Sequence, residues 1–311
     1  MNQVTILLAT YNGGKYLEQQ LLSLLAQHYK NWSLLIRDDG SNDDTLEIIQ
    51  KYISLDKRIA LINDNLGSLG CVNNFLILLS HSQTPYTIFC DQDDIWLENK
   101  LEVLVNSMHG MDESVPRLAY GGAYLYNLQT GVGPHEIIYP VHDLQAMLFR
   151  GSGLRGCSLL FNAALRRKVL NYKGTTSMHD FTVTFLAILF GETIMVNRPL
   201  MLYRQHESNV TGHTPDSHKA LVRFFFSDYR HKGILIPEVF QTIKQITACF
   251  YEQIAPDKRR LLDAFLDFPN KSRVSMFWFV LRHRCTLYGK ISPILIKILT
   301  RKLWASNPSY P

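Results

Sequence analysis

The chain has 311 residues, with 32 Lys and Arg against 27 Asp and Glu, so its formal net charge is +5. Hydrophobic residues make up 46% of the chain and charged residues 19%, which excludes a disordered polymer and leaves room for one large domain or two smaller ones. The five cysteines are widely spaced and include no CxxC pair. These features argue against a disulfide scaffold or a cysteine zinc site, and they favour a reducing compartment.

The first residues lack the basic start and apolar core of a secretion signal. The best candidate for a membrane span, residues 181–196, contains Glu192. We therefore expect a cytoplasmic protein. Its positive charge is concentrated in residues 268–311, which contain eight Lys or Arg and no Asp or Glu, so the rest of the chain is slightly acidic.

The first hundred residues alternate between the periodicities of strands and helices. The expected elements are strands at residues 4–8, 33–37, 58–62 and 86–90, and helices around residues 17–25, 46–53 and 75–79. Ser41 and Asp44 have the spacing of a capping box at the start of the second helix. Strands that alternate with helices predict a parallel sheet with right-handed crossovers.

Ligands of such sheets bind outside the carboxyl ends of the strands. The residues at these ends are 9–11, 38–41 and 91–94, and the last two groups are rich in carboxylates. Like charges repel each other unless a cation neutralises them, so this edge of the sheet predicts a metal ion or a basic ligand.

Residues 91–94 read Asp-Gln-Asp-Asp directly after an apolar strand. Alternate carboxylates can share a hard divalent cation such as Mg²⁺ or Mn²⁺, which would in turn hold a diphosphate. The other interpretation is a solvated acidic turn, since Asp is common in turns. Residues 38–41, which read Asp-Asp-Gly-Ser, are by themselves ordinary turn chemistry.

Taken in order, four motifs resemble the family 2 glycosyltransferases of the GT-A fold. They lie in residues 4–12, 36–43, 90–96 and 178–212, and the resemblance covers about residues 3–213. The last segment contains Met178-His179-Asp180, Tyr203-Arg204-Gln205-His206, Asn209 and Gly212. It is similar to the bacterial rhamnosyltransferase-like branch, which builds surface polysaccharides such as capsule and O-antigen.

The resemblance implies an α/β fold with a mostly parallel central sheet flanked by helices. It implies a catalytic domain over residues 1–214, which leaves residues 215–311 as a helical, basic C-terminal region. It also implies an inverting, metal-dependent transfer of a sugar, with rhamnose as one candidate, from a nucleotide-diphosphate donor. The acceptor would be a saccharide or a lipid-linked saccharide, and the metal Mg²⁺ or Mn²⁺.

The resemblance further implies roles for single residues on the donor side. Ala9 and Tyr11 would border the nucleotide base, and Asp39 would accept a hydrogen bond from the pyrimidine N–H. Asp91 would lie near the ribose and the metal, and Asp93 would be the direct metal ligand. Ala9 replaces the Pro that is usual in the family before Thr-Tyr-Asn, a change we expect to alter the turn and leave the chemistry intact.

Other residues are assigned to the metal, the diphosphate and the acceptor. Asp180 matches the catalytic base, although an N-cap of the following helix is the alternative. His206 would contact the metal, and Arg204 and Arg155 would lie near the diphosphate or the acceptor. Trp96 would stack on a sugar, or else belong to the core.

The C-terminal region suggests helices with apolar faces at residues 224–226, 276–279 and 294–299. Basic residues beside aromatic ones suit an anionic membrane surface on the inner face of the cell membrane, while the alternative is a helical cap with a solvated basic rim. No nucleic-acid module is visible, so we expect no nucleic-acid partner. Two rival functions are an inactive nucleotide-sugar-binding relative and a scaffold of a polysaccharide assembly complex.

Overall fold

The computed structural model describes residues 2–136, 138–150, 153–206 and 233–305. The chain divides into two compact units. The sheet unit comprises Met1–Ile138, Leu154–Asn171 and Glu192–Asn209, and the helical unit comprises Tyr139–Gly153, Tyr172–Gly191 and Val210–Pro311. The expected domain boundary at residues 214 and 215 and the motif residues Asn209 and Gly212 lie outside the described residues.

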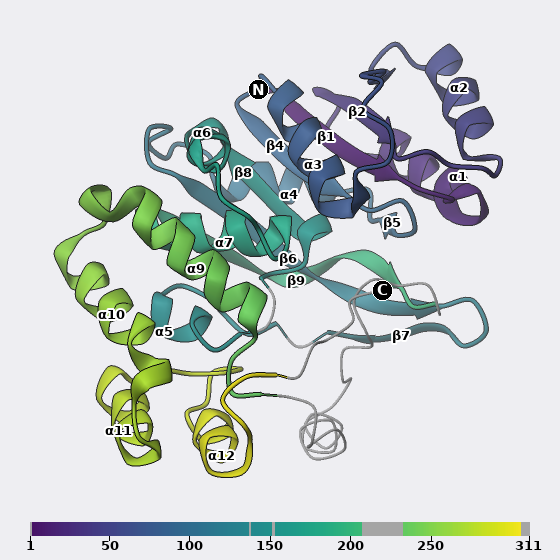
Figure 1. Cartoon of the computed structure of the whole chain (residues 1–311). Coiled ribbons are helices and arrows are strands. Elements are labelled where there is room, and N and C mark those ends of the chain that lie inside the picture. Colours follow the sequence, from purple (N-terminus) through teal and green to yellow (C-terminus); the bar gives the residue numbers. More distant parts are fainter. Residues whose placement is uncertain (1, 137, 151–152, 207–232, 306–311) are drawn as a thin grey trace. The chain divides into compact units, whose positions relative to one another are not determined.

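The sheet unit contains one mixed sheet (Figure 1), in which the described strands follow the order β3-β2-β1-β4-β8-β6-β9-β5, with β7 beside β6. The strands are β1 (Val4–Thr10), β2 (Trp32–Asp38), β3 (Ile59–Leu61), β4 (Tyr86–Cys90), β5 (Ile95–Trp96), β6 (Arg117–Asn127), β7 (Gly131–His135), β8 (Leu159–Asn162) and β9 (Glu192–Arg204).

Strand direction brings several carboxyl ends to one edge of the sheet. β1 pairs in parallel with both β2 and β4, and β2 pairs in parallel with β3. β8 is antiparallel to β4 and to β6, and β6 is parallel to β9. The strands β1, β2, β4, β6 and β9 therefore run in the same direction, and the residues that follow them meet at one edge.

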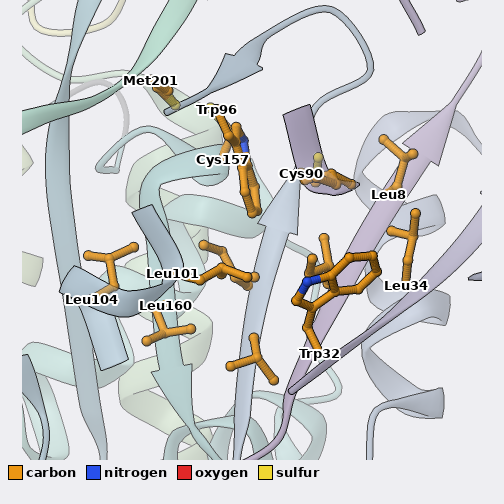
Figure 2. Packing of buried hydrophobic residues seen from close by; sticks show 14 of the residues in the cluster. Leu8, Trp32, Leu34, Cys90, Trp96, Leu101, Leu104, Cys157, Leu160 and Met201 are labelled. Atoms are coloured by element: carbon orange, nitrogen blue, oxygen red, sulfur yellow. The ribbon is translucent and has the colours of Figure 1, made fainter. Parts of the chain in front are cut away.

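Helices cover both faces of this sheet. They are α1 (Gly14–Leu25), α2 (Thr45–Leu55), α3 (Gly70–His81), α4 (Lys100–Ser107) and α6 (Ala163–Asn171). Leucines of α1 and α4 share one hydrophobic cluster with strand residues such as Leu34 and Leu160, part of which Figure 2 shows. Phe89 of β4 points to the other face, because successive residues of a strand alternate, and its ring lies 5.2 Å from that of Phe75 in α3.

The predicted elements of the first hundred residues are present, with shifted ends. The strand expected at residues 58–62 is Ile59–Leu61, and the helix expected at 75–79 begins earlier, at Gly70. The expected capping box at Ser41 and Asp44 is wrong. Asp44 occupies the N-cap position of α2 without a side-chain cap, and the Ser41 hydroxyl donates instead to Asp38 Oδ1 at 2.6 Å.

The helical unit packs around a cluster of aromatic rings. Its helices are α5 (Leu144–Met147), α7 (His179–Phe190), α9 (Pro237–Phe250), α10 (Pro256–Leu266), α11 (Arg273–His283) and α12 (Ser292–Thr300). The ring of Phe149 lies 5.5 Å from Phe265 and 5.2 Å from Phe268, which in turn lies 5.3 Å from Phe279 of α11.

The helices expected at residues 276–279 and 294–299 are therefore confirmed as parts of α11 and α12. The helix expected at residues 224–226 lies outside the described residues. Among the helices that the structure describes, none combines the length and the hydropathy needed to cross a bilayer.

Candidate active site

The turn after β1 is held by the side chain of Gln92. The Tyr11 N–H donates to Gln92 Oε1 at 2.9 Å, and Gln92 Nε2 donates to the Tyr11 carbonyl at 3.0 Å; we call these two bonds the Tyr11–Gln92 clasp. A Cβ at Gly13 would overlap Gln92 Oε1, so the clasp requires a residue without a side chain there. The Tyr11 side chain is left 53% exposed, and Ala9 is half-buried at the end of β1.

Asp39, after β2, accepts four hydrogen bonds from the protein. Its Oδ1 accepts from Arg37 Nη1 at 3.0 Å and from the Leu69 N–H at 2.8 Å. Its Oδ2 accepts from the Ser68 hydroxyl at 3.0 Å and from the Gly70 N–H at 2.8 Å. Burial by itself raises the pKa of Asp39, but these donors outweigh it and hold the pKa below its ordinary value.

Arg37 is a buried cation that holds the loop after β3. Its Nε donates to Asp64 Oδ2 at 2.8 Å, and its Nη2 donates to Asp64 Oδ1 at 3.1 Å and to the Gly67 carbonyl at 2.9 Å. The hydrogen bonds from Arg37 lower the pKa of Asp64. Because Arg37 joins Asp39 and Asp64, one guanidinium fixes the loop that supplies the other donors to Asp39.

The turn after β4 gathers three carboxylates in two environments. The ligand atoms of Asp91, Asp94 and Cys157 lie within 4.8 Å of one another. Asp93 Oδ2 instead lies 2.8 Å from His206 Nε2. Asp94 Oδ1 accepts the Arg204 N–H at 3.1 Å, and Asp94 Oδ2 is buried without an N–H or O–H partner among the described residues.

Burial and mutual repulsion disturb the titration of this turn. Burial, reinforced by the neighbouring Asp93 carboxylate, raises the pKa of Asp91 to about 6 and that of Asp94 to about 7. The Cys157 thiol, a weak donor, lowers the pKa of both carboxyl groups without cancelling these effects. The turn is therefore poorly neutralised by the protein itself, which is the condition that favours a bound cation.

Residues at the end of β9 position the turn after β4, residues 91–94, which we call the acidic turn. Arg204 is 1% exposed, and its Nε donates to the Asp93 carbonyl at 2.6 Å while its Nη2 donates to Gln19 Oε1 at 2.5 Å. The ring of His206 lies 4.8 Å from that of Tyr16 in α1. The backbone of the turn and the imidazole next to Asp93 are thus both positioned by residues at the end of β9.

A further buried cation, Lys100, lies at the start of α4. Its side chain is fully buried, and Nζ donates to the Cys157 carbonyl at 2.7 Å and lies 3.8 Å from the centre of the Trp96 ring. Burial lowers the pKa of Lys100 to about 8, although the thiols and carboxylates around it, Asp94 among them, act in the opposite direction. Lys100 therefore supplies part of the positive charge that the acidic turn faces.

Two residues expected near the substrates are engaged in contacts within the protein. The guanidinium of Arg155 forms two parallel bonds to Glu136, at 2.7 and 3.0 Å, and lies 3.7 Å from the ring centre of Tyr203. Trp96 is 3% exposed in the hydrophobic cluster, which favours the core interpretation of this residue over sugar stacking.

Asp180 belongs to the helical unit. It is 7% exposed and lies in the first turn of α7, where the helix dipole stabilises an anion. The N-cap position is occupied by Met178, so the N-cap interpretation of Asp180 is wrong. A Cβ at Gly153 would lie 2.7 Å from the Asp180 carbonyl, so the two segments approach as closely as a glycine allows. Burial lowers the pKa of the neighbouring His179 to about 3, which keeps its ring neutral.

The structure thus brings Asp93 together with His206 and Arg204, and Asp91 with Asp94 and Cys157. Sequence reasoning missed Asp94 and Cys157, as well as the residues that position the two acidic turns. These are Arg37, Asp64, Gln92 and Lys100. The third acid within residues 91–94 was a visible signal for Asp94, and an Arg directly after the apolar run of a strand was one for Arg37.

The acidic turn has the donor set for a divalent cation. It offers carboxylate oxygens, one imidazole nitrogen and one thiol, and the buried Asp94 Oδ2 is short of a strong donor. Carboxylates suit Mg²⁺ and Mn²⁺, and an imidazole is accepted more readily by Mn²⁺ than by Mg²⁺. The residues present therefore fit the metal that the sequence predicts.

Comparisons with known proteins show what this chain is similar to. The UDP-Glc:alpha-D-GlcNAc-diphosphoundecaprenol beta-1,3-glucosyltransferase WfgD of Escherichia coli is 30% identical over 170 residues, which are 54% of this chain and 62% of the relative. The dTDP-rhamnosyl transferase RfbG of Shigella flexneri is 27% identical over 223 residues, which are 66% of this chain and 73% of the relative. For two further relatives, 39% and 35% identical, the chain spans only 43% and 39% of their length.

The fold is also found among solved structures. TarS of S. aureus, in complex with UDP-GlcNAc, superposes with a TM-score of 0.58 over 96% of this chain and 79% of TarS, at 16% identity. This likeness shows the expected GT-A fold. The model of glycosyl transferase family 2 matches residues 5–174, which is more than half of the chain, and the chain therefore belongs to that family.

Proposed function

We propose that this protein transfers a sugar from a nucleotide-diphosphate donor to a saccharide or lipid-linked saccharide acceptor, with inversion at the anomeric carbon. The observation that carries the proposal is the gathering of Asp39, Asp91, Asp93 and Asp94 at the carboxyl edge of the sheet. Carboxylates at this edge suit a cation and, through it, a diphosphate. Membership of the family supports sugar transfer as the reaction.

On the donor side, Ala9 and the exposed ring of Tyr11 border the base, and Asp39 receives the pyrimidine N–H. Asp39 already accepts four bonds, which fill the lone pairs of a carboxylate. A base N–H must therefore replace one of the four donors. The Ser68 hydroxyl is the donor best suited to yield, because it is the only one of the four that can turn away by rotation of a single side-chain bond.

Asp93, Asp91 and His206 would hold the divalent cation, and the Asp94 carboxylate, close to Asp91, would add negative charge. When bound, the cation supplies Lewis-acid stabilisation of the charge that develops on the leaving diphosphate. Arg204 keeps the backbone of the turn in place through the Asp93 carbonyl. Arg155 contributes through its pair with Glu136, by fixing the segment that begins β8, and we assign it no direct contact with the donor.

On the acceptor side, Asp180 is the general base. The acceptor oxygen forms the new bond to the anomeric carbon, the bond to the diphosphate oxygen breaks, and Asp180 takes the proton of the acceptor hydroxyl. This is a single displacement without a covalent intermediate, so one carboxylate suffices. The assignment rests on the match of Asp180 to the base of the family.

The names of two relatives support a choice of donor and acceptor. RfbG is named for dTDP-rhamnose, and WfgD for a UDP-glucose donor and a diphosphoundecaprenol-linked acceptor. We therefore favour rhamnose or a hexose as the sugar, and a lipid-linked acceptor in surface polysaccharide synthesis. A lipid-linked acceptor also favours action at the inner face of the cell membrane.

The test is a panel of dTDP-rhamnose and UDP-hexoses, with Mn²⁺ or Mg²⁺ and with EDTA, read as metal-dependent transfer or donor hydrolysis. Asp93→Ala should abolish turnover while the fold is retained. Glu102→Ala, which removes an exposed carboxylate of α4, is the matched control and should match the parent. Turnover of Asp93→Ala near the parent level in saturating metal would refute the metal assignment. Donor binding without any turnover by the parent would favour the inactive nucleotide-sugar-binding protein.

A further inference from the structure

The helix α11 carries apolar residues on two opposite faces. Met276, Phe279 and Val280 are buried, and the ring of Phe279 packs on the aromatic cluster of the helical unit. On the outer side, Val274 is 68% exposed and Trp278 is 65% exposed. A solvent-facing helix surface normally carries polar residues, so an exposed Trp next to an exposed Val requires an explanation.

The exposed residues of α11 form a stripe. Val274, Trp278 and Arg282 follow one another at intervals of four residues, so they lie on one face of the helix, and Arg282 is exposed as well. Phe277 and Leu281, which are half-buried, lie beside this face. We call these five residues the α11 stripe.

The neighbouring helix α12 extends the apolar surface. Arg273 at the start of α11 donates to the carbonyls of Ile298 and Arg301 at the end of α12, at 2.8 and 2.7 Å, and Figure 1 shows the two helices next to each other. Leu299, beside Ile298, is 73% exposed. Two adjacent helices of the same unit therefore both present large apolar side chains to solvent.

The C-terminal segment that carries this surface is rich in cations. Residues 268–311 contain eight Lys or Arg and no Asp or Glu. Arg282, Arg284, Lys290 and Lys302 are all exposed. An anionic lipid surface complements both these cations and the apolar stripe.

We propose that the α11 stripe, together with Leu299, is a membrane-docking surface that binds anionic phospholipid headgroups and inserts the Trp278 ring between them. Trp is suited to this position because its ring is apolar while its N–H can bond to the headgroup region. The proposal rests on the membrane location proposed above, but it does not depend on the transfer reaction. The described helices bind along the surface and do not cross it.

The experiment uses the full chain and vesicles of phosphatidylcholine, with or without about one third phosphatidylglycerol, and measures binding by co-sedimentation and Trp fluorescence. The parent should bind the anionic vesicles, and added salt should weaken this binding. Trp278→Ser should weaken it roughly tenfold or more, because burial of part of an indole ring is lost. Arg282→Gln should weaken it about fivefold, the equivalent of one basic residue near the surface.

Matched controls lie on α2 and beside it in the sheet unit. Leu55 is also 68% exposed, and Lys57 is exposed, so Leu55→Ser and Lys57→Gln remove the same kinds of group elsewhere and should bind as the parent does. Because Trp278 is largely exposed, its variant should keep the thermal unfolding temperature of the parent. Transfer to a water-soluble acceptor analogue should also be unchanged, so failure of docking can be told apart from failure of the proposed reaction.

Three results would overturn the proposal. They are no binding of the parent to anionic vesicles, equal binding by the parent and Trp278→Ser, and self-association of the parent that Trp278→Ser abolishes without an effect of lipid. The last result would assign the stripe to contact between copies of the chain. Binding that is anionic, salt-sensitive and dependent on both Trp278 and Arg282 would support the proposal.

Discussion

Replacing Asp94 by Asn should change how the stability of the metal-free protein depends on pH. Burial and the adjacent carboxylates raise the pKa of Asp94 from 3.8 to about 7. Between these values the folded protein holds a proton that the unfolded chain releases, so the free energy of unfolding falls as the pH rises. Asn has no such proton, yet it keeps the oxygen that accepts the Arg204 N–H at 3.1 Å.

The size of the effect follows from the proton count. One proton held by the folded state alone changes the free energy of unfolding by about 1.4 kcal/mol per pH unit. Because the proton is half released at pH 7, a change from pH 5 to pH 7 costs the parent about 2 kcal/mol through Asp94. The variant should thus gain about 2 kcal/mol relative to the parent over this interval.

The assay is urea unfolding of both proteins at pH 5, 6, 7 and 7.5 in EDTA, with Glu102→Gln as a control whose difference from the parent should not change with pH. Addition of Mn²⁺ at pH 7.5 should then stabilise the parent more than Asp94→Asn, because the cation relieves the repulsion within the turn. A parent-to-variant difference that stays constant from pH 5 to 7.5 would refute the account of the acidic turn given above.

Three further predictions concern the rest of the site. Arg37→Met should lower the free energy of unfolding by about 3 kcal/mol, since it leaves the Asp39 carboxylate buried without its cation. Because the pKa of Asp39 is lowered in the folded parent, the parent should lose stability as the pH falls below about 4. Urea unfolding at pH 3 and pH 7 should show a smaller loss in the variant. Asp180→Asn should keep donor binding by calorimetry but lose roughly 10²–10⁴-fold in turnover, and turnover within a few-fold of the parent would place the base elsewhere. Gln92→Ala should weaken donor binding by roughly tenfold, because it removes the two neutral hydrogen bonds that hold the Tyr11 turn. Thermal unfolding serves as the control for the fold. Unchanged donor affinity would count against a role of this turn in binding the base.

The elements that could be predicted are those whose signal is local. The strands at Val4–Thr10 and Tyr86–Cys90 are short apolar runs that end in turn residues, and both were found at or near their true ends. The expected capping box is absent because Asp38 binds the Ser41 side chain in place of the helix N-terminus, and the helix pattern does not show this contact. The hydroxyl and the N–H of Ser41 both bond to Asp38, at 2.6 and 2.8 Å, so Ser41 closes the turn after β2 and leaves α2 to start four residues later.

The candidate site likewise contains residues that the local sequence reveals and residues that it does not. Asp39, Asp91 and Asp93 could be picked out because acids at strand ends have a known meaning in parallel sheets, although their roles remain predictions. Lys100 could not be picked out, since a Lys at the start of an amphipathic helix is usually exposed. It is buried here by tertiary packing against Trp96. Long-range contacts of this kind leave no trace in the local sequence pattern.

The Tyr11–Gln92 clasp has a consequence for how a site of this kind can diversify. Within the part of the chain that the structure describes, the Gln92 side chain bonds only to the backbone N–H and carbonyl of Tyr11, so the clasp imposes no requirement on which side chain position 11 carries. The ring above it is 53% exposed and can be exchanged without a change in the core. The shape of this turn, which we propose borders the base, is maintained by Gln92 and Gly13. The side chain that the turn displays can be altered by one substitution at position 11. Saturation mutagenesis at position 11 should accordingly yield folded proteins with altered nucleotide preference, whereas the same treatment of position 13 should yield few.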